Sequence, residues 1–453
     1  MTLNPADSSV FGGLFGTDEI RALFDDRRRL GFMLEVEVAL ARAQAALGII
    51  PSEAASAIAA AADPAAFDLV QIRAETEKAG QPVMALAKAL TQAAGAEAGR
   101  WVHWGATTQD ITDTALVLQL RTALDPIERD LMALIGALAT QAERHRTLVM
   151  AGRSFLQQAL PVSFGYKVAV WLSPLLRHIE RLRQLKPRLL QVQFGGAVGT
   201  LASLGDQGRA VTERLAADLS LACPIAPWHG ARDGIAELGA WLGLVAGSLA
   251  KFAGDVILLA QTEVGELVET TETGRGGSST MPQKRNPILC THIVAAASGV
   301  EALVPLLLAA QHHQLERAVG PWQAEALALP QALALTAGAL AQAIRVAEGM
   351  RPDAARMRAN LAITNGLVMA ERVMMTLADR LGRSEAHHLV QAACLTAMAE
   401  DRPLRDILGE NAEVASRLDP AALDHLMDPA GYLGESAAVV DRVVAAARAM
   451  SSP

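Results

Sequence analysis

The sequence is poor in the residues that build sheet cores and disulfide-bonded scaffolds. Of its 453 residues only 4% are aromatic and three are cysteines, whereas 51% are hydrophobic. An apolar set dominated by alanine and leucine favours helices, since β-sheets draw on aromatic and β-branched side chains. Cys223, Cys290 and Cys394 lie far apart and have neither metal-ligand spacing nor the pattern of a disulfide framework. We therefore expect an all-α protein with reduced thiols.

Long apolar runs and targeting signals are missing as well. The longest apolar run, residues 239–250, has 12 residues, whereas a helix that crosses a bilayer needs about 20. The first ten residues contain neither the basic region nor the apolar core of a secretion signal. The formal net charge of −8 argues against nucleic acid or an anionic membrane as a partner. We expect a cytoplasmic protein, in which an anionic substrate would need a local cationic site.

Several catalytic and cofactor motifs are not found. The sequence contains no P-loop, no dinucleotide fingerprint after a strand, no HExxH, no CxxC pair and no GxSxG. The glycine-rich residues 195–200 lie between helical segments, where a tight turn is a better interpretation than a phosphate cradle. We expect a reaction that uses neither a cofactor nor a metal ion.

The sequence is instead rich in heptad periodicity. Apolar residues alternate at intervals of four and three along residues 120–138, 168–182 and 238–259, the pattern of helices that pack lengthwise on near-parallel partners. A further apolar helix is expected from residue 288 to 308, with a continuation over residues 327–350.

These segments predict a central long-helix bundle over residues 112–353. Shorter amphipathic segments indicate an N-terminal helical domain over residues 1–111 and a C-terminal one over residues 354–453. Helices near 30 residues seldom bury every seam within one chain, so we expect a homo-oligomer in which the bundles associate. An autonomous bundle is the alternative.

Four polar islands interrupt the helical pattern. The first, residues 101–114, precedes a long helix and carries the candidate binding residues His103, Thr107, Thr108 and Gln109. Unpaired amides and the positive dipole end at a helix start can hold a carboxylate. Ordinary helix capping, with Asp110 as a cap, is the alternative.

The second and fourth islands each contain an arginine. Residues 152–161 carry Arg153, Ser154 and Gln157, and residues 312–325 carry Arg317, a candidate anion ligand. A loop with a surface arginine and a solvated helix end are the respective alternatives.

The third island, residues 274–287, combines glycines, Ser278, Lys284 and Asn286. A glycine-rich loop can close over a ligand and deliver a hydroxyl, while its cations stabilise developing negative charge. A disordered linker is the alternative. We predict that this segment is a catalytic loop.

The stretch "GSSTMPQKRNP" in this loop resembles the signature of the fumarase/aspartase superfamily. "VHWGATTQD", "GRSFLQQALP" and "FGGAVGTLA" resemble other superfamily regions in the same order, so the resemblance covers essentially the whole chain. It implies three helical domains and a homotetramer whose active sites form where regions from three subunits meet. It also implies addition or elimination of a group β to a carboxylate, through an aci-carboxylate intermediate.

The resemblance also implies roles for individual residues. Ser278 matches the serine that moves the proton α to the carboxylate, while Lys284 and Asn286 match residues that steady the loop and the acid. The carboxylate-binding cluster is matched by Thr107, Thr108 and Gln109. We expect Arg317 and Lys284 to balance the substrate's charge. His103 is a candidate for binding or proton transfer, with a purely structural histidine as the alternative.

One departure from the superfamily pattern narrows the implied chemistry. Many of its lyases place a histidine where this chain has Phe155, which cannot exchange a proton. In this respect the sequence resembles the cycloisomerase branch of the superfamily. That branch implies a reaction in which one carboxylate of a tricarboxylic muconate adds across a double bond of the same molecule and closes a lactone. The alternatives are a fumarate-releasing lyase of the adenylosuccinate or argininosuccinate type, a cycloisomerase for sulfonated or otherwise substituted muconates, and an inactive crystallin-like assembly.

Overall fold

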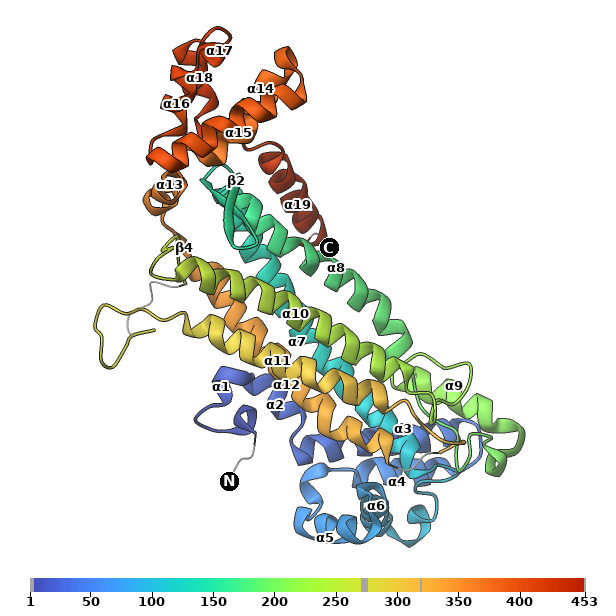
Figure 1. Ribbon diagram of the computed structural model, residues 1–453. Helices are drawn as coiled ribbons and strands as arrows, with labels where there is room; N and C mark the ends of the chain where they lie inside the picture. Colours follow the sequence, from blue (N-terminus) through green and yellow to red (C-terminus); the bar gives the residue numbers. More distant parts are fainter. Residues whose placement is uncertain (1–3, 270–275, 318–319, 452–453) are drawn as a thin grey trace. The chain divides into compact units, whose positions relative to one another are not determined.

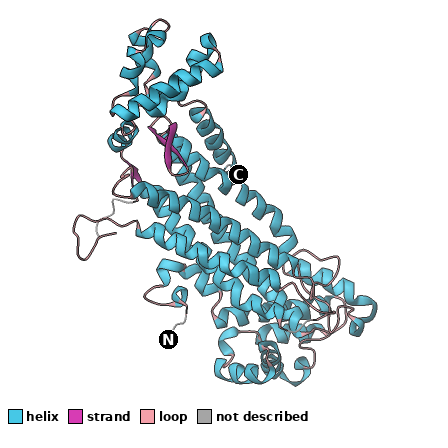
Figure 2. Ribbon diagram, viewed as in Figure 1, coloured by secondary structure: helices cyan, strands magenta, loops and turns pink. Residues whose placement is uncertain are grey.

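The computed structural model describes residues 4–269, 276–317 and 320–451. Within these ranges helices make up most of the structure, and strands form two small antiparallel pairs (Figures 1 and 2). The all-α prediction is therefore confirmed. The heptad segments lie on long helices: α7 (Thr108–Arg144), α8 (Phe164–Leu189), α10 (Asp233–Ala260), α11 (Ile288–Ala309) and α12 (Ala324–Gly349).

The heptad seams are buried as their periodicity predicts. No seam side chain of α10 is more than 4% exposed, and the seams of α7 and α8 are buried as completely. The α10 seam consists of Leu238, Leu242, Val245, Leu249, Phe252, Val256 and Leu259. Leucine, valine and isoleucine occupy most of the seam positions, so the long helices are joined by a close-packed aliphatic core.

The chain divides into two compact units, and each is described by itself. Unit 1 comprises Met1–Leu131, His178–Leu249 and His292–Gln342, and unit 2 comprises Met132–Arg177, Ala250–Thr291 and Ala343–Pro453. The predicted three-domain division at residues 111 and 353 stays a prediction.

Unit 1 contains the N-terminal helices and α9. Their bounds are α1 (Gly12–Phe15), α2 (Asp18–Leu23), α3 (Asp26–Ala46), α4 (Ser52–Ala61), α5 (Leu69–Ala79), α6 (Pro82–Gly99) and α9 (Gly208–Asp218). Phe32 and Leu40 of α3 share one core cluster with Leu118 of α7 and Leu215 of α9. This cluster supports the start of α7, where the first polar island lies.

Unit 2 contains the strands and the C-terminal helices. The strands are β1 (Val149–Ser154), β2 (Gln157–Ser163), β3 (Leu267–Val268) and β4 (Arg351–Pro352). The helices are α13 (Ala354–Ala362), α14 (Ala370–Leu381), α15 (Arg383–Glu400), α16 (Leu404–Glu410), α17 (Ala412–Ala415), α18 (Pro420–Leu426) and α19 (Ser436–Ser451). Val373, Val390, Leu404 and Leu423 belong to the core cluster of this C-terminal module.

Three helical segments are long and apolar enough to cross a membrane by length and composition alone. They are Asp233–Ala260, Ile288–Ala309 and Pro321–Gly349, with mean hydropathies of 1.7, 1.8 and 1.5, and one bent pair would raise the number to four. Isolated polar residues interrupt each of these helices, so none of them contains an apolar run long enough to indicate a membrane span. Only 28% of the apolar window in Ile288–Ala309 is buried, so one chain leaves much of α11 uncovered.

Candidate active site

The start of α7 is capped by the side chain of Asp110. The Thr107 backbone N–H, just before the helix, donates to Asp110 Oδ2 at 2.9 Å. A side chain three residues into a helix that accepts from the preceding amide is half of a capping box. The predicted capping role of Asp110 is therefore observed.

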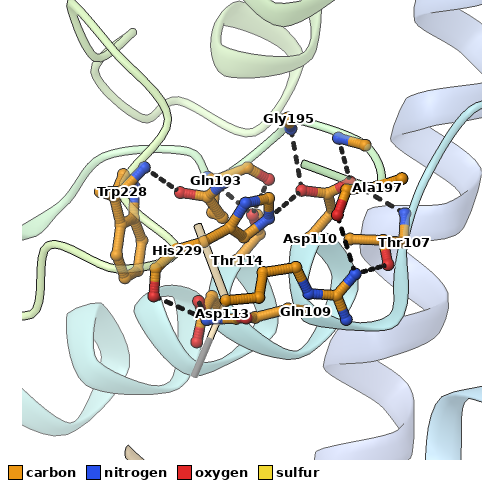
Figure 3. A network of polar contacts seen from close by, with 12 residues as sticks. Thr107, Gln109, Asp110, Asp113, Thr114, Gln193, Gly195, Ala197, Trp228 and His229 are labelled. Carbon is orange, nitrogen blue, oxygen red and sulfur yellow. Dashed lines mark hydrogen bonds and ion pairs between the residues drawn. The ribbon is translucent and has the colours of Figure 1, made fainter. Parts of the chain in front are cut away.

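Asp110 also binds the glycine-rich turn and a histidine, as Figure 3 shows. Its carboxylate accepts from the Gly195 and Gly196 amides at 2.8 and 2.9 Å, and its Oδ1 lies 2.7 Å from His229 Nε2. Gly196 has φ 66°, and a Cβ there would lie 3.1 Å from the Gly105 carbonyl oxygen. The buried carboxylate thus fixes the turn against the α7 start.

The Thr107 hydroxyl is used by an arginine from far along the chain. Arg317 Nη1 donates to Thr107 Oγ1 at 2.6 Å and to the Ala197 carbonyl oxygen at 3.3 Å. Arg317 is exposed and has no acidic partner among the described residues. Together with half-buried Thr108 and the first-turn amides of α7, it forms a cationic site suited to a carboxylate.

Gln109, predicted to bind substrate, points into the protein. Its side chain is 2% exposed, and Nε2 donates to Asp113 Oδ2 and to the His229 carbonyl oxygen, each at 3.0 Å. Its position in the first helical turn directs it toward the core side of α7. In the structure, Gln109 therefore links Asp113 of α7 to the His229 segment and does not face a ligand.

A buried ion cluster lies next to this contact. Fully buried Arg232 donates to both carboxylate oxygens of Asp113 and to Glu325. Its guanidinium lies 4.9 Å from the Trp228 ring centroid and 5.9 Å from that of Trp322. Burial raises the pKa of Glu325, which the hydrogen bond and charge of Arg232 oppose. Sequence reasoning missed this cluster, because its charges carry no pattern that separates them from surface charges.

Half-buried His103 forms a pair with a buried carboxylate. Its Nδ1 lies 2.6 Å from Glu37 Oε1, and Glu37 is 2% exposed. Burial lowers the pKa of His103, but the hydrogen bond that its ring donates to Glu37 and the charges of Glu37 and Asp110 outweigh this effect, so the net pKa is raised. The histidine is thereby held with a fixed ring orientation and a bias toward the charged form.

In unit 2 the second polar island forms a β-hairpin, an element that its sequence did not predict. β1 and β2 pair from Val149 and Ser163 to Ser154 and Gln157, which leaves Phe155 and Leu156 as a two-residue turn. Both have positive φ, 51° and 62°, as a type I′ hairpin turn requires. Sequence preference does not predict this turn at Phe155 and Leu156, because type I′ turns favour Asn-Gly.

The side chains at the tip of the hairpin are exposed to solvent, whereas the arginine at the base of the hairpin is held in an ion pair. Phe155 is 100% exposed and Leu156 is 72% exposed, while Ser154 and Gln157 are also exposed. Arg153 instead forms a two-point ion pair with buried Glu266.

The predicted catalytic loop is described from residue 276 onward, and its first two residues, Gly274 and Arg275, lie outside the described residues. Ser278 Oγ accepts hydrogen bonds from the Thr280 and Met281 amides at 3.3 and 3.0 Å. Lys284 is exposed, and its side chain has no ion-pair partner in the described part of the chain. Asn286 Nδ2 donates to the Gly276 carbonyl oxygen at 3.2 Å, which closes the loop.

Two family profiles match the chain. One described as lyase covers residues 15–301, and one described as adenylosuccinate lyase C-terminus covers residues 366–443. The chain belongs to the fumarase/aspartase superfamily of lyases. The fold and the signature loop of this superfamily member agree with the resemblance seen in its sequence.

Individual relatives are similar over nearly their full lengths. The superfamily member is 50% identical to the 3-carboxy-cis,cis-muconate cycloisomerase of Pseudomonas aeruginosa, with 97% of this chain and 96% of that protein covered. The crystal structure of 3-carboxy-cis,cis-muconate lactonizing enzyme from Pseudomonas putida matches with a TM-score of 0.94 at 47% identity, covering 98% of this chain and 100% of that one. Trans-aconitate decarboxylase 1 of Mycosarcoma maydis is 44% identical, with 96% and 89% covered.

Proposed function

We propose that this superfamily member is a cycloisomerase that converts 3-carboxy-cis,cis-muconate to 4-carboxymuconolactone. Relatives with the cycloisomerase name are 43–50% identical over nearly the full chain. The observation that carries the proposal is Phe155, exposed at the hairpin tip where many superfamily lyases place a histidine. An addition whose nucleophile is already an anionic carboxylate has no amine or hydroxide leaving group to protonate, so it does not need that histidine.

The reaction balances without a co-reactant. One carboxylate oxygen adds to the conjugated diene and forms the lactone C–O bond, while the electron pair moves onto a neighbouring carboxylate as an aci-carboxylate. The carbon α to that carboxylate then takes a proton from Ser278, and the serine regains its proton from solvent. The trianion and one solvent proton thus give the lactone dianion, and the two free acids are isomers, so the proposed site needs neither a cofactor nor a metal ion.

The loop geometry supports Ser278 as the proton donor. Two backbone amides donate to its Oγ, and amide donors stabilise the negative charge that remains when the hydroxyl gives up its proton. Lys284, exposed on the same loop, balances the charge of the tricarboxylate, and Asn286 holds the loop and the acid.

The cationic site at the α7 start supports binding of a substrate carboxylate. Thr107, Thr108 and Arg317 supply hydroxyl and guanidinium donors there, and Ser154 and Gln157 supply polar contacts beside the hairpin tip. His103, paired with Glu37, assists binding as a cationic donor near this helix start. These roles make a small anionic tricarboxylate the substrate class.

We infer that the protein is a cytoplasmic homotetramer with active sites shared between subunits, and that it has no nucleic-acid or membrane partner. The sparsely buried apolar window of α11 supports association, and so do exposed side chains on other long helices, such as Leu244 and Leu327. Covering such faces with copies of themselves removes apolar area from water. Light scattering of the purified protein tests the tetramer directly.

One competition experiment separates the proposed function from its rivals. The purified protein is offered 3-carboxy-cis,cis-muconate, a sulfonated muconate, argininosuccinate, adenylosuccinate and trans-aconitate, and products are identified by NMR. We expect the carboxymuconate to be turned over most efficiently, with the lactone as product. Preferential fumarate release would establish the lyase alternative, carbon dioxide release from trans-aconitate would indicate a decarboxylase, and inactivity on every acid would indicate an inactive assembly.

A further inference from the structure

A closed ring of contacts lies directly beneath the hairpin tip, entirely within unit 2. Arg153 and Gln158 are paired across β1 and β2. Arg153 donates from Nη1 and Nη2 to the two carboxylate oxygens of Glu266, each at 2.8 Å. Asn360 Nδ2 donates to Glu266 Oε1 at 2.8 Å, and Gln158 Nε2 donates to the Asn360 carbonyl oxygen at 2.9 Å. Each of the four residues thus contacts two of the others, by strand pairing or by a hydrogen bond.

The carboxylate at the centre of the ring is buried, and both of its oxygens accept hydrogen bonds. The side chain of Glu266 is 0% exposed, and Asn360 is 2% exposed. The second hydrogen bond from Asn360 Nδ2 goes to the Val264 carbonyl oxygen at 2.8 Å. Three charge-assisted donors on one buried carboxylate make a rigid junction, because any lost donor leaves charge uncompensated in a dry site.

The backbone conformation of the hairpin tip is unfavourable for the two residues that adopt it. Phe155 and Leu156 both adopt positive φ, which costs energy for residues with a side chain. Both expose large apolar side chains to solvent. A conformation of this kind persists where surrounding structure enforces it, and such positions concentrate at functional sites.

The same ring is tied to the base of the catalytic loop. Glu266 precedes β3, which pairs with β4 just before α13, the helix that carries Asn360. Three residues after Glu266, the Glu269 carboxylate accepts from the Cys290 amide at 2.7 Å, at the start of α11. The segment that anchors the hairpin therefore also frames the loop that contains Ser278.

We propose that Glu266 and Asn360 are positioning residues for the cycloisomerase reaction. With Arg153 and Gln158 they fix the hairpin tip, so that Ser154, Phe155 and Gln157 are presented to the substrate in one orientation. Arg153 then belongs to the frame and is not a substrate ligand. This inference rests on the proposed function, since it names what orients that same site.

The test is Asn360→Asp, with Asn365→Asp as the matched control. The substitution at Asn360 sets a second carboxylate against Glu266 and removes both amide donors, with almost no change in volume. Asn365 lies nearby in the chain, and its Nδ2 donates to exposed Asp401 at 3.0 Å. The control therefore also brings two carboxylates together, but outside the ring.

We expect Asn360→Asp to lower kcat by about 10- to 100-fold at pH 8, with little change in KM, because misplacement of positioned groups affects the transition state most. The loss should shrink toward pH 6, since a proton shared by the two carboxylates restores one donor. Other charged groups near Glu266 are Arg153 and Lys167, with Arg356 on α13. They are the same in the control, so a pH response common to both variants would belong to them.

Hydrogen exchange at the hairpin amides gives a readout that does not depend on activity. Asn360→Asp should accelerate exchange at residues 154–157 and Asn365→Asp should not. If wild type is inactive on 3-carboxy-cis,cis-muconate, the proposed function fails even where exchange changes. If wild type is active while Asn360→Asp matches it in kcat at every pH, or leaves exchange unchanged, the positioning role is wrong.

A second pair of variants covers the case in which Asn360→Asp does not fold. Leu156→Gly allows this residue of the turn to take positive φ without strain. The turn conformation then depends less on the contacts of the ring. We expect Asn360→Ala to cost about 10-fold in kcat in the wild-type background but under about threefold in the Leu156→Gly background. Equal losses in both backgrounds would overturn the proposal.

Discussion

Arg317 donates to the hydroxyl of Thr107 across 2.6 Å, although 210 residues separate the two in sequence. The contact places at the start of α7 an arginine that has no acidic partner among the residues that the structure describes. Thr107 is held there by Asp110, which also fixes the glycine turn. In the proposed function, this helix start receives a substrate carboxylate, and the loop with Ser278 supplies the proton.

Arg317→Gln should lower kcat/KM by about 100-fold, because a donor to a developing or bound anion is lost. Thr107→Val keeps the shape and removes the hydroxyl, and should cost about 10-fold. Steady-state kinetics of both single variants and the double variant measures their coupling. Arg129→Gln, which breaks an exposed pair with Glu19, is the control and should behave as wild type. Purely additive losses would show that the two side chains do not act together.

Ser278→Ala should reduce kcat by at least about 1,000-fold while the assembly and melting temperature stay unchanged, because the hydroxyl held by two amides is removed. Ser279→Ala is the matched control, since the adjacent exposed hydroxyl contacts only Thr280 among the described residues. We expect it to retain activity within a few-fold. Near-normal turnover by Ser278→Ala would show that Ser278 is not the proton donor.

Phe155→His tests the meaning of the departure at the hairpin tip. Lactonisation should persist or weaken, because the added imidazole has no leaving group to protonate and alters an apolar tip. Initial rates with 3-carboxy-cis,cis-muconate at several pH values provide the measurement, with Phe155→Leu as a size control. A large gain in rate from the histidine would contradict our explanation of why it is missing.

Glu37→Gln should lower the pKa of His103, because it removes the hydrogen-bonded carboxylate that raises it. In wild type the raised pKa stabilises the fold fully below about pH 6.5, the ordinary value. This contribution is lost as the pH rises through the folded-state value. NMR titration of the His103 ring in both proteins checks the shift, and urea unfolding between pH 6 and 8.5 checks the stability. An unchanged titration would show that Glu37 does not control the histidine.

Arg232→Met should destabilise the fold by about 3–5 kcal/mol, because it leaves Asp113 and Glu325 buried without their cation. Arg209→Met removes one partner of an exposed pair with Glu213 and should cost under about 1 kcal/mol. Denaturant unfolding gives both values. Since burial raises the pKa of Glu325, the native state of the variant binds more protons than the unfolded chain. Its deficit should therefore grow as the pH rises from 5 to 8, and a pH-independent deficit would contradict this.

Features that repeat locally along the sequence could be predicted, whereas features that depend on tertiary contacts could not. Heptad spacing identified the seam from Leu238 to Leu259, all of which is buried, because apolar periodicity is repeated and local. The hairpin was missed, since Phe155 and Leu156 are poor formers of the turn they adopt. The ion cluster of Arg232 and the ring at Glu266 were missed because isolated charges look alike whether buried or exposed. The pairing of Thr107 with Arg317 depends on tertiary folding, which spacing within one sequence does not encode.

The most direct test of the central claim is the ultraviolet absorbance of 3-carboxy-cis,cis-muconate mixed with the purified wild-type protein, without added metal or cofactor. We predict that the conjugated-diene band disappears at a rate proportional to protein concentration, and that this rate falls at least about 1,000-fold with Ser278→Ala. A band that persists with the folded wild-type protein would show that the protein is not a 3-carboxy-cis,cis-muconate cycloisomerase.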